Sequence, residues 1–204
     1  MLECFTFEPK ESFGSNCYVL KSGSEFCIID PSVSYDTVKG ALGDISKNIR
    51  YIILTHCHFD HILALDEWIE LSGVLPSMSY LTSENIKSSR TNCYRLFFGV
   101  DKFYDGGCNT VKEGDTLPFG DTALYILETP GHTNGSVCIV CEDAVFVGDT
   151  LFADGSFGRC DLPSGNKLLL PTSISKILEL DCKRIFSGHG RATTTEEAKK
   201  YSYM

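Results

Sequence analysis

Short apolar runs separated by glycine, serine and proline open the chain and predict β-strands. Three such runs, CFTF, NCYVLKSG and EFCIID, lie within residues 4–30, and a fourth, IRYIIL, follows at 49–54. β-Branched and aromatic residues between turn-forming residues are typical of strands. Residues 35–47 are predicted to be helical, and at 61–71 apolar residues recur at helical spacing.

The stretch 73–109 has no regular pattern and is rich in aromatic residues. Strand patterns then return as TALYILETP, SVCIVCE and AVFVGDT, followed by a predicted helix at 167–180 and by KRIFSGHG, a strand that runs into a loop. Strands and helices thus occur in two similar blocks. This order predicts an α/β architecture in which helices cover packed sheets. A length of 204 residues is typical of one domain, so we expect a single domain over 1–204.

Composition narrows the function classes. Apolar residues make up 43% and charged residues 22% of the chain, as in ordinary globular proteins. The net charge of -9 argues against a nucleic-acid partner, because phosphate binding needs accumulated positive charge. The first ten residues lack the basic and apolar regions of a signal peptide, and no apolar run approaches the roughly 18 residues of a membrane span. We therefore expect a cytoplasmic protein without a membrane partner.

Ten cysteines are scattered irregularly along the chain. Without a secretion signal they are expected to be reduced thiols and not a disulfide framework. Cys138 and Cys141 form a C-x-x-C pair, which in a redox protein normally opens a helix. Here the pair lies within the strand-like run SVCIVC, so we interpret it as strand core.

The strongest chemical signal is the sequence His56-Cys-His58-Phe-Asp60-His61, directly after the strand at 49–54. Residues two apart in extended backbone project to the same side, so His56, His58 and Asp60 can converge on one point. Cys57 then points the opposite way and is interpreted as packing. Imidazole and carboxylate groups in this density are typical of a site for a divalent metal.

The remaining two histidines follow glycines at strand ends. His132 lies in TPGHTNGS, His189 lies in FSGHG, and Asp149 follows a glycine in AVFVGDT. Each glycine is expected to allow a tight turn that aims the next side chain inward. All five histidines of the chain are then accounted for by one site.

These motifs resemble those of the metallo-β-lactamase superfamily. The pattern H-x-H-x-D-H, then P-G-H-T-x-G-S, G-D-T-L-F and S-G-H-G, covers the chain from the early strands to about Thr193. Within it, GDTLFADGSFGRCDLPSGN is similar to the glyoxalase II (hydroxyacylglutathione hydrolase) branch. The resemblance implies an αββα sandwich with a metal site at one edge of two sheets.

The resemblance also implies a ligand set. His56, His58 and His132 would hold a first metal, Asp60, His61 and His189 a second, and Asp149 would bridge the two. The expected cofactors are two divalent ions, zinc first, with iron or manganese as alternatives that suit the same nitrogen and oxygen ligands.

The implied reaction is hydrolysis of a thioester. Two metal ions roughly 3.5 Å apart would share a hydroxide that attacks the acyl carbon, while a metal polarises the carbonyl oxygen. Asp60 is expected to orient this nucleophile as well as to bind the second metal. A thiolate, with a thiol pKa of about 8.5, leaves without a general acid, which none of the motifs supplies.

The substrate is less well defined. Full-length glyoxalase II has a C-terminal helical domain that helps to bind glutathione, and about fifteen residues follow His189 here, so the chain resembles the short forms. After G-D-T-L-F, the family has a basic residue and a tyrosine that hold glutathione; this chain has Arg159 and, in place of the tyrosine, Asp161. Arg159 either binds a substrate carboxylate or is a structural residue paired with Asp161.

Two other features stay open. Asp30 ends a strand before Pro31, where it either orients a metal-bound histidine or only forms the turn. The aromatic segment 73–109 is expected to shape the pocket wall, with Tyr94, Phe97 or Phe98 as candidates.

Three alternatives to a thioester hydrolase remain. A persulfide dioxygenase with one iron shares much of the motif set, but the presence of Asp60, His61 and His189 favours two metals. A lactonase would use the same attacking group on a ring ester. A non-catalytic role is disfavoured because all seven ligand residues are present. A β-lactamase is usually secreted, and no signal peptide is expected here.

Overall fold

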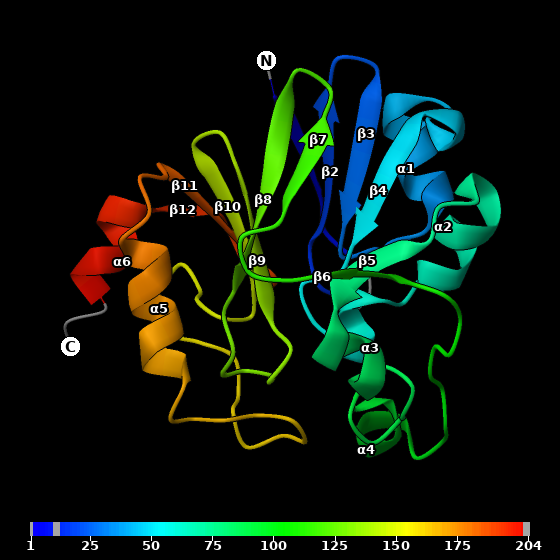
Figure 1. The fold of residues 1–204 in the computed structure, drawn as a ribbon. Coiled ribbons are helices and arrows are strands. Elements are labelled where there is room, and N and C mark those ends of the chain that lie inside the picture. The colour runs from blue at the N-terminus through cyan, green and yellow to red at the C-terminus, as the bar shows by residue number, and fades with distance from the viewer. Residues whose placement is uncertain (1, 10–12, 202–204) are drawn as a thin grey trace.

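The computed structural model describes residues 2–9 and 13–201. The strands form two six-stranded sheets that pack face to face (Figure 1). The first sheet has the order β1 (Glu3–Phe7), β2 (Cys17–Ser22), β3 (Glu25–Ile29), β4 (Ile49–Ile53), β5 (Pro76–Ser79), β6 (Asn109–Val111). The second has the order β12 (Thr193–Thr194), β11 (Arg184–Ser187), β10 (Ala144–Gly148), β9 (Val137–Cys141), β8 (Thr122–Glu128), β7 (Thr116–Phe119).

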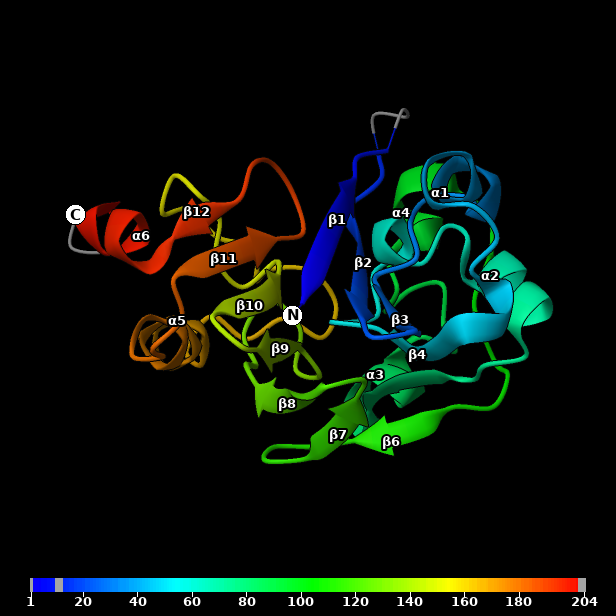
Figure 2. The same cartoon turned by 90° about the horizontal axis from the view of Figure 1, so that it is seen from above.

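Helices cover the outer face of each sheet (Figure 2). The chain forms α1 (Tyr35–Leu42), α2 (Leu65–Ser72), α3 (Tyr80–Asn85), α4 (Tyr94–Phe98), α5 (Leu170–Leu178) and α6 (Thr195–Tyr201), with 3-10 turns η1 (Ser46–Asn48) and η2 (Phe59–His61). Helices α1 and α2 pack on the first sheet, and α5 and α6 pack on the second. The predicted αββα sandwich is therefore confirmed. Within the described ranges, no helix has the length and apolar content that a membrane span requires.

Strands β3 and β9 lie inside their sheets and carry apolar side chains on both faces. In β3, Cys27 and Ile29 point into the core between the sheets, whereas Ile28 points into the core beneath α1 and α2. Strand β9 alternates in the same way: Cys141 lies in the core between the sheets and Cys138 in the core beneath α5 and α6. The C-x-x-C pair is therefore strand core, as predicted, and its two sulfurs lie on opposite faces of the sheet. All ten cysteines are free thiols.

Three predicted helices are shorter in the structure. The helix predicted at 35–47 ends at Leu42, because Gly43 adopts a positive φ of 77° and caps it. The helix predicted at 61–71 begins only at Leu65, and the residues before it form the 3-10 turn η2. The third, predicted at 167–180, spans Leu170–Leu178. The segment 73–109 was wrongly predicted to be irregular: it contains β5, α3 and α4, elements of four to six residues that are too short for a periodic signal.

Trp68 anchors α2 over the first sheet. It is fully buried, donates from Nε1 to the carbonyl of Val33 at 2.9 Å, and meets the Tyr35 ring edge-on at 5.3 Å between centroids. We expect Trp68→Ala to lower the free energy of unfolding by about 3–5 kcal/mol, measured by urea denaturation, because it leaves a cavity and an unpaired carbonyl. Leu71→Ala on the exposed side of α2 is the control and should cost less than about 1 kcal/mol.

Candidate metal centre

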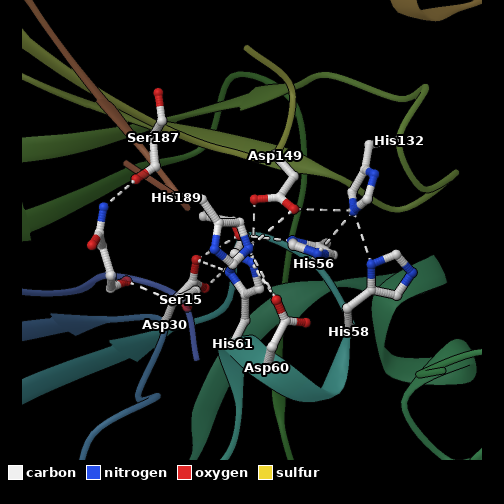
Figure 3. Close-up of polar contacts among 12 residues, drawn as sticks. Ser15, Asp30, His56, His58, Asp60, His61, His132, Asp149, Ser187 and His189 are labelled. Atoms are coloured by element: carbon white, nitrogen blue, oxygen red, sulfur yellow. Dashed lines mark hydrogen bonds and ion pairs between the residues drawn. The ribbon is translucent and has the colours of Figure 1, made fainter. Parts of the chain in front are cut away.

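Loops that follow four strands meet at one edge of the sandwich, and they carry seven imidazole and carboxylate side chains (Figure 3). The side chains form two groups: His56, His58 and His132 in the first, and Asp60, His61, Asp149 and His189 in the second. The first sheet supplies the residues after β4, and the second sheet supplies those after β8, β10 and β11. These are the seven residues that the sequence singled out.

The first group consists of three buried imidazoles. The Nε2 atom of His132 lies 3.2 Å from Nε2 of His56 and 2.8 Å from Nδ1 of His58. Three ring nitrogens therefore converge on one point from two loops. Three imidazoles with an open fourth position are a donor set that suits zinc and related divalent metals.

The second group combines carboxylates with imidazoles. The Oδ2 atom of Asp60 lies 3.0 Å from Nε2 of His189 and 3.6 Å from Nε2 of His61. The Oδ1 atom of Asp149 lies 3.3 Å from the same nitrogen of His61. Mixed nitrogen and oxygen donors at this spacing suit a second divalent ion.

The Asp149 carboxylate lies between the two groups. Its Oδ2 atom is 3.7 Å from Nε2 of His132 in the first group and 3.5 Å from Nε2 of His189 in the second. A single carboxylate with an oxygen near both groups has the position that a bridging ligand needs. The two groups are therefore adjacent parts of one centre.

Asp30 orients one histidine of each group. Its Oδ2 atom accepts a hydrogen bond from Nδ1 of His61 at 2.7 Å and another from the Thr55 hydroxyl at 2.7 Å. Because that hydroxyl donates to Asp30, it accepts from Nδ1 of His56, which lies 3.0 Å away. Both imidazoles then carry a proton on Nδ1 and turn Nε2 toward the centre. Of the two readings of Asp30, the structure supports the orienting one.

His132 is oriented by a different loop. Its Nδ1 donates to the main-chain carbonyl of Arg159 at 2.8 Å, which again leaves Nε2 free to face the centre. The loop after β10 therefore positions a histidine of the β8–β9 connection through its backbone. This partner could not be identified from a motif, because any residue at position 159 supplies the same carbonyl.

Burial and charge set the protonation of the centre. Burial lowers the pKa of His58 to about 3 and also holds the pKa values of His56 and His132 below their ordinary value, so all three are neutral. Burial opposes ionisation of Asp60 and Asp149, but the neighbouring histidines, His61 first among them, together outweigh it and lower both pKa values. Neutral imidazoles and ionised carboxylates are the forms that bind a metal.

Buried polar atoms without a partner show that these residues fit metal ions. Among the described residues, Nε2 of His61 and Oδ1 of Asp149 have no hydrogen-bond partner, although both are inaccessible. Leaving such an atom unpaired costs about 1–3 kcal/mol. A divalent ion between these atoms would satisfy both, and it would offset the negative charge of the two carboxylates.

Two glycines make room for the centre. At Gly188 a Cβ atom would collide with Oδ1 of Asp149 and would lie 2.6 Å from Cε1 of His61. Its φ is not positive, so no left-handed backbone requires a glycine here; what the missing side chain allows is a close approach. At Gly158, which the motifs did not single out, a Cβ atom would lie 2.5 Å from Nδ1 of His132.

The centre lies at the base of a cavity of about 330 Å³. Aromatic side chains form much of its wall, namely those of Phe13, Phe59, Phe97, Phe152 and Phe157. Of the three aromatic candidates from the segment 73–109, only Phe97 lines this cavity. Tyr94 and Phe98 pack instead against Phe59, with ring centroids 5.8 and 5.2 Å away.

Arg159 also lines the cavity, but its guanidinium is engaged. It forms a bidentate ion pair with Asp161, with Nε and Nη2 each about 3 Å from a carboxylate oxygen (3.0 and 2.9 Å). Both side chains are mostly exposed, at 64% and 69%. The structure thus contains the structural pairing that was one of the two readings of Arg159, and substrate binding by it stays a prediction.

Comparison with known proteins identifies the family. A model of the metallo-β-lactamase superfamily matches residues 12–189, which is most of the chain. The chain belongs to the metallo-β-lactamase superfamily. It is 33% identical to a protein of Bacillus subtilis named a probable metallo-hydrolase, over 91% of this chain and 89% of that one. It is 30% identical to a probable metallo-hydrolase of Methanocaldococcus jannaschii, over 87% of this chain and 88% of that one.

Solved structures agree with this membership. The fold matches the crystal structure of a B3 metallo-β-lactamase, BLEG-1, with a TM-score of 0.87 and 28% identity over 99% of this chain and 98% of that one. It matches a protein crystallised in a di-iron-bound form with a TM-score of 0.81 and 26% identity, over 97% and 96% of the two chains. The superfamily fold and a candidate metal-binding centre are thus combined in one chain, and the glyoxalase II branch stays a prediction.

Gly188→Ala should weaken metal binding without unfolding the protein. The backbone of Gly188 cannot shift easily to avoid the collision. Its N–H donates to the Gly148 carbonyl at 2.7 Å, and its carbonyl accepts from the main-chain amide of Asn16 at 2.7 Å. We expect at least about a tenfold loss of zinc affinity, measured by competition with a chelator. Gly40→Ala, whose Cβ meets nothing within 4 Å, is the control and should bind metal normally.

Metal binding should release a proton from His61. Burial alone would lower its pKa, but the carboxylates of Asp30, Asp60 and Asp149 raise it well above the ordinary value, so His61 is charged at neutral pH before metal binds. A metal needs the neutral ring, so about one proton should leave on binding, and affinity should fall as pH decreases. Calorimetry in two buffers of different ionisation enthalpy measures this number. Asp30→Asn should reduce the number of protons released, and an unchanged number would contradict the assignment of this proton to His61.

Proposed function

We propose that this protein is a metal-dependent thioester hydrolase that acts on a small S-acyl thiol. The observation that carries the proposal is the placement of Asp149 between two groups of metal-binding side chains at the base of a cavity. This arrangement suits two divalent ions, for which zinc is our first candidate. Iron is the alternative, since one solved structure of the same fold is di-iron-bound.

The side chains of the centre prepare the hydrolysis. Two divalent ions held there would supply a Lewis acid for the carbonyl oxygen and would lower the pKa of water in contact with them. Asp60 faces the cavity beside His189 and stays ionised, so it can accept a hydrogen bond from the attacking water and orient it. Hydrogen bonds already orient the imidazoles of His56, His61 and His132, so these rings need not move during the reaction. This lowers the free-energy cost of reorganising the site in the transition state.

The rest of the cavity favours a thiolate leaving group. Among the residues that the structure describes, the titratable side chains that line it, apart from those of the centre, are Cys93 and Arg159. An arginine does not release a proton at neutral pH, and burial raises the pKa of Cys93 to about 11 while its thiol donates to the Thr91 carbonyl. Neither is placed as a general acid. A thiolate leaves without one, whereas an amide nitrogen needs a proton.

A ring ester or a β-lactam is the second candidate class. The B3 metallo-β-lactamase of known structure shares the fold over nearly its whole length. Strain in a four-membered ring would lessen the need for a general acid. The persulfide dioxygenase alternative uses a single iron and leaves the second group of four side chains without a function.

A substrate panel tests the proposal. The metal-loaded protein is assayed against S-acyl thiols, a lactone and a β-lactam. We expect kcat/KM for the thioesters to exceed that for the other substrates. Metal analysis of protein isolated without added metal is the companion measurement. One iron per chain, together with oxygen uptake on a persulfide, would replace the hydrolase with a dioxygenase.

Asp149→Ala should abolish thioester hydrolysis and lower the metal content, because it removes the carboxylate between the two groups. We expect a loss of at least about a hundredfold in kcat/KM, as is common when a metal-bound catalytic group is removed. Asp36→Ala removes an exposed carboxylate from α1 and is the control. Full activity of the Asp149 variant would show that the centre is not the catalytic site.

A further inference from the structure

A second cavity adjoins the metal centre. It is an open groove of about 970 Å³ between the segment 87–103, which belongs to the first half of the chain, and the loop 159–163, which follows β10. Arg159 and Leu162 line both this groove and the cavity of the centre, so the two spaces meet along these residues. A substrate that reaches the metals can therefore extend into the groove.

The groove is basic in a protein that is acidic overall. Lys87, Arg90, Arg95 and Arg159 line it, against two carboxylates, Asp101 and Asp161. The whole chain has a net charge of -9, with 18 Lys and Arg against 27 Asp and Glu, so a surface on which basic side chains outnumber acidic ones differs from the rest of the chain. A local excess of positive charge attracts anionic ligands even when the net charge is negative.

Three of the four basic side chains already have acidic partners. Lys87 is paired with Glu84 at 2.6 Å, and the Arg159 guanidinium is held by Asp161. Arg95 forms a two-contact pair with Asp101, at 3.2 and 3.0 Å. These pairs neutralise most of the positive charge of the groove.

Arg90 is different. Within residues 2–9 and 13–201, its guanidinium makes no ion pair or hydrogen bond, although the side chain is exposed and lines the groove. Its main-chain amide donates to the Ser88 hydroxyl at 3.3 Å, and this local hydrogen bond stabilises the backbone turn at this position. The free cation of the groove is therefore Arg90 and not Arg159, the residue that the sequence motif pointed to.

We propose that Arg90 binds an oxyanion, carboxylate or phosphate, on the thiol part of the substrate and thereby sets the preference of the enzyme for anionic thioesters. This inference rests on the proposed hydrolase function. The planar guanidinium can form two parallel hydrogen bonds to either group. Leu96, Phe103 and Leu162 line the same groove and provide apolar contacts for the aliphatic part that joins the anion to the sulfur.

The test is equilibrium binding, which needs no turnover. Two matched pairs of non-hydrolysable thioethers are used: a pantetheine thioether with and without a phosphate, and a glutathione thioether with free or amidated carboxylates. We expect at least one anionic form to bind about tenfold more tightly than its neutral partner at low ionic strength. The pair with the larger preference distinguishes phosphate from carboxylate.

Variants assign the preference to one residue. Arg90→Ala should remove the discrimination, and Arg90→Lys should restore part of it. Arg50→Ala removes an exposed arginine at the start of β4, far along the strand from the centre, and should keep the full preference. In hydrolysis assays, Arg90→Ala should raise KM for the anionic thioester about tenfold. It should leave kcat for that substrate and KM for the neutral thioester unchanged.

The outcomes separate the two proposals. Equal binding of both forms in every pair, or an unchanged preference in Arg90→Ala, would overturn the anion site while hydrolysis of thioesters could still be observed. If no thioester is hydrolysed but the anionic thioethers still bind more tightly and this preference depends on Arg90, the hydrolase proposal is overturned and the anion site is retained.

Discussion

The buried carboxylate of Asp30 is the interaction on which the centre depends. Asp30 directly follows β3 and has a positive φ of 53°, and its carboxylate accepts hydrogen bonds from the Thr55 main-chain amide, the Thr55 hydroxyl and Nδ1 of His61. Through Thr55 it also fixes His56, so one side chain orients a candidate ligand in each metal group. An unfavourable backbone conformation persists here because three hydrogen bonds hold it in place.

The two layers of the sandwich contribute unequal parts of the site. The first sheet carries the H-x-H-x-D-H loop and the segment with Arg90, whereas the second sheet supplies Asp149, His132 and His189. The imidazoles and carboxylates of the centre lie close together where these loops meet, and the reaction is proposed to take place there. Substrate preference is proposed to depend on the more exposed groove beside it.

Much of the fold and of the centre could be predicted from local patterns. Strands such as β3 and β9 alternate between two buried faces, which makes them apolar throughout and easy to detect. Helix ends were less predictable, because Gly43 ends α1 early and η2 delays α2. Short elements such as α4, with five residues, have too little periodicity to be recognised.

The sequence alone determined which side chains belong to the centre, because histidines and aspartates at strand ends have few other uses in that density. It did not determine which partners hold them or which cations remain free. The Arg159 carbonyl that fixes His132, the space at Gly188 and the pairing of Arg159 with Asp161 all depend on loops that are distant in the chain. Only the tertiary structure brings these loops together, and so only the tertiary structure shows that the Arg90 guanidinium has no partner among the described residues.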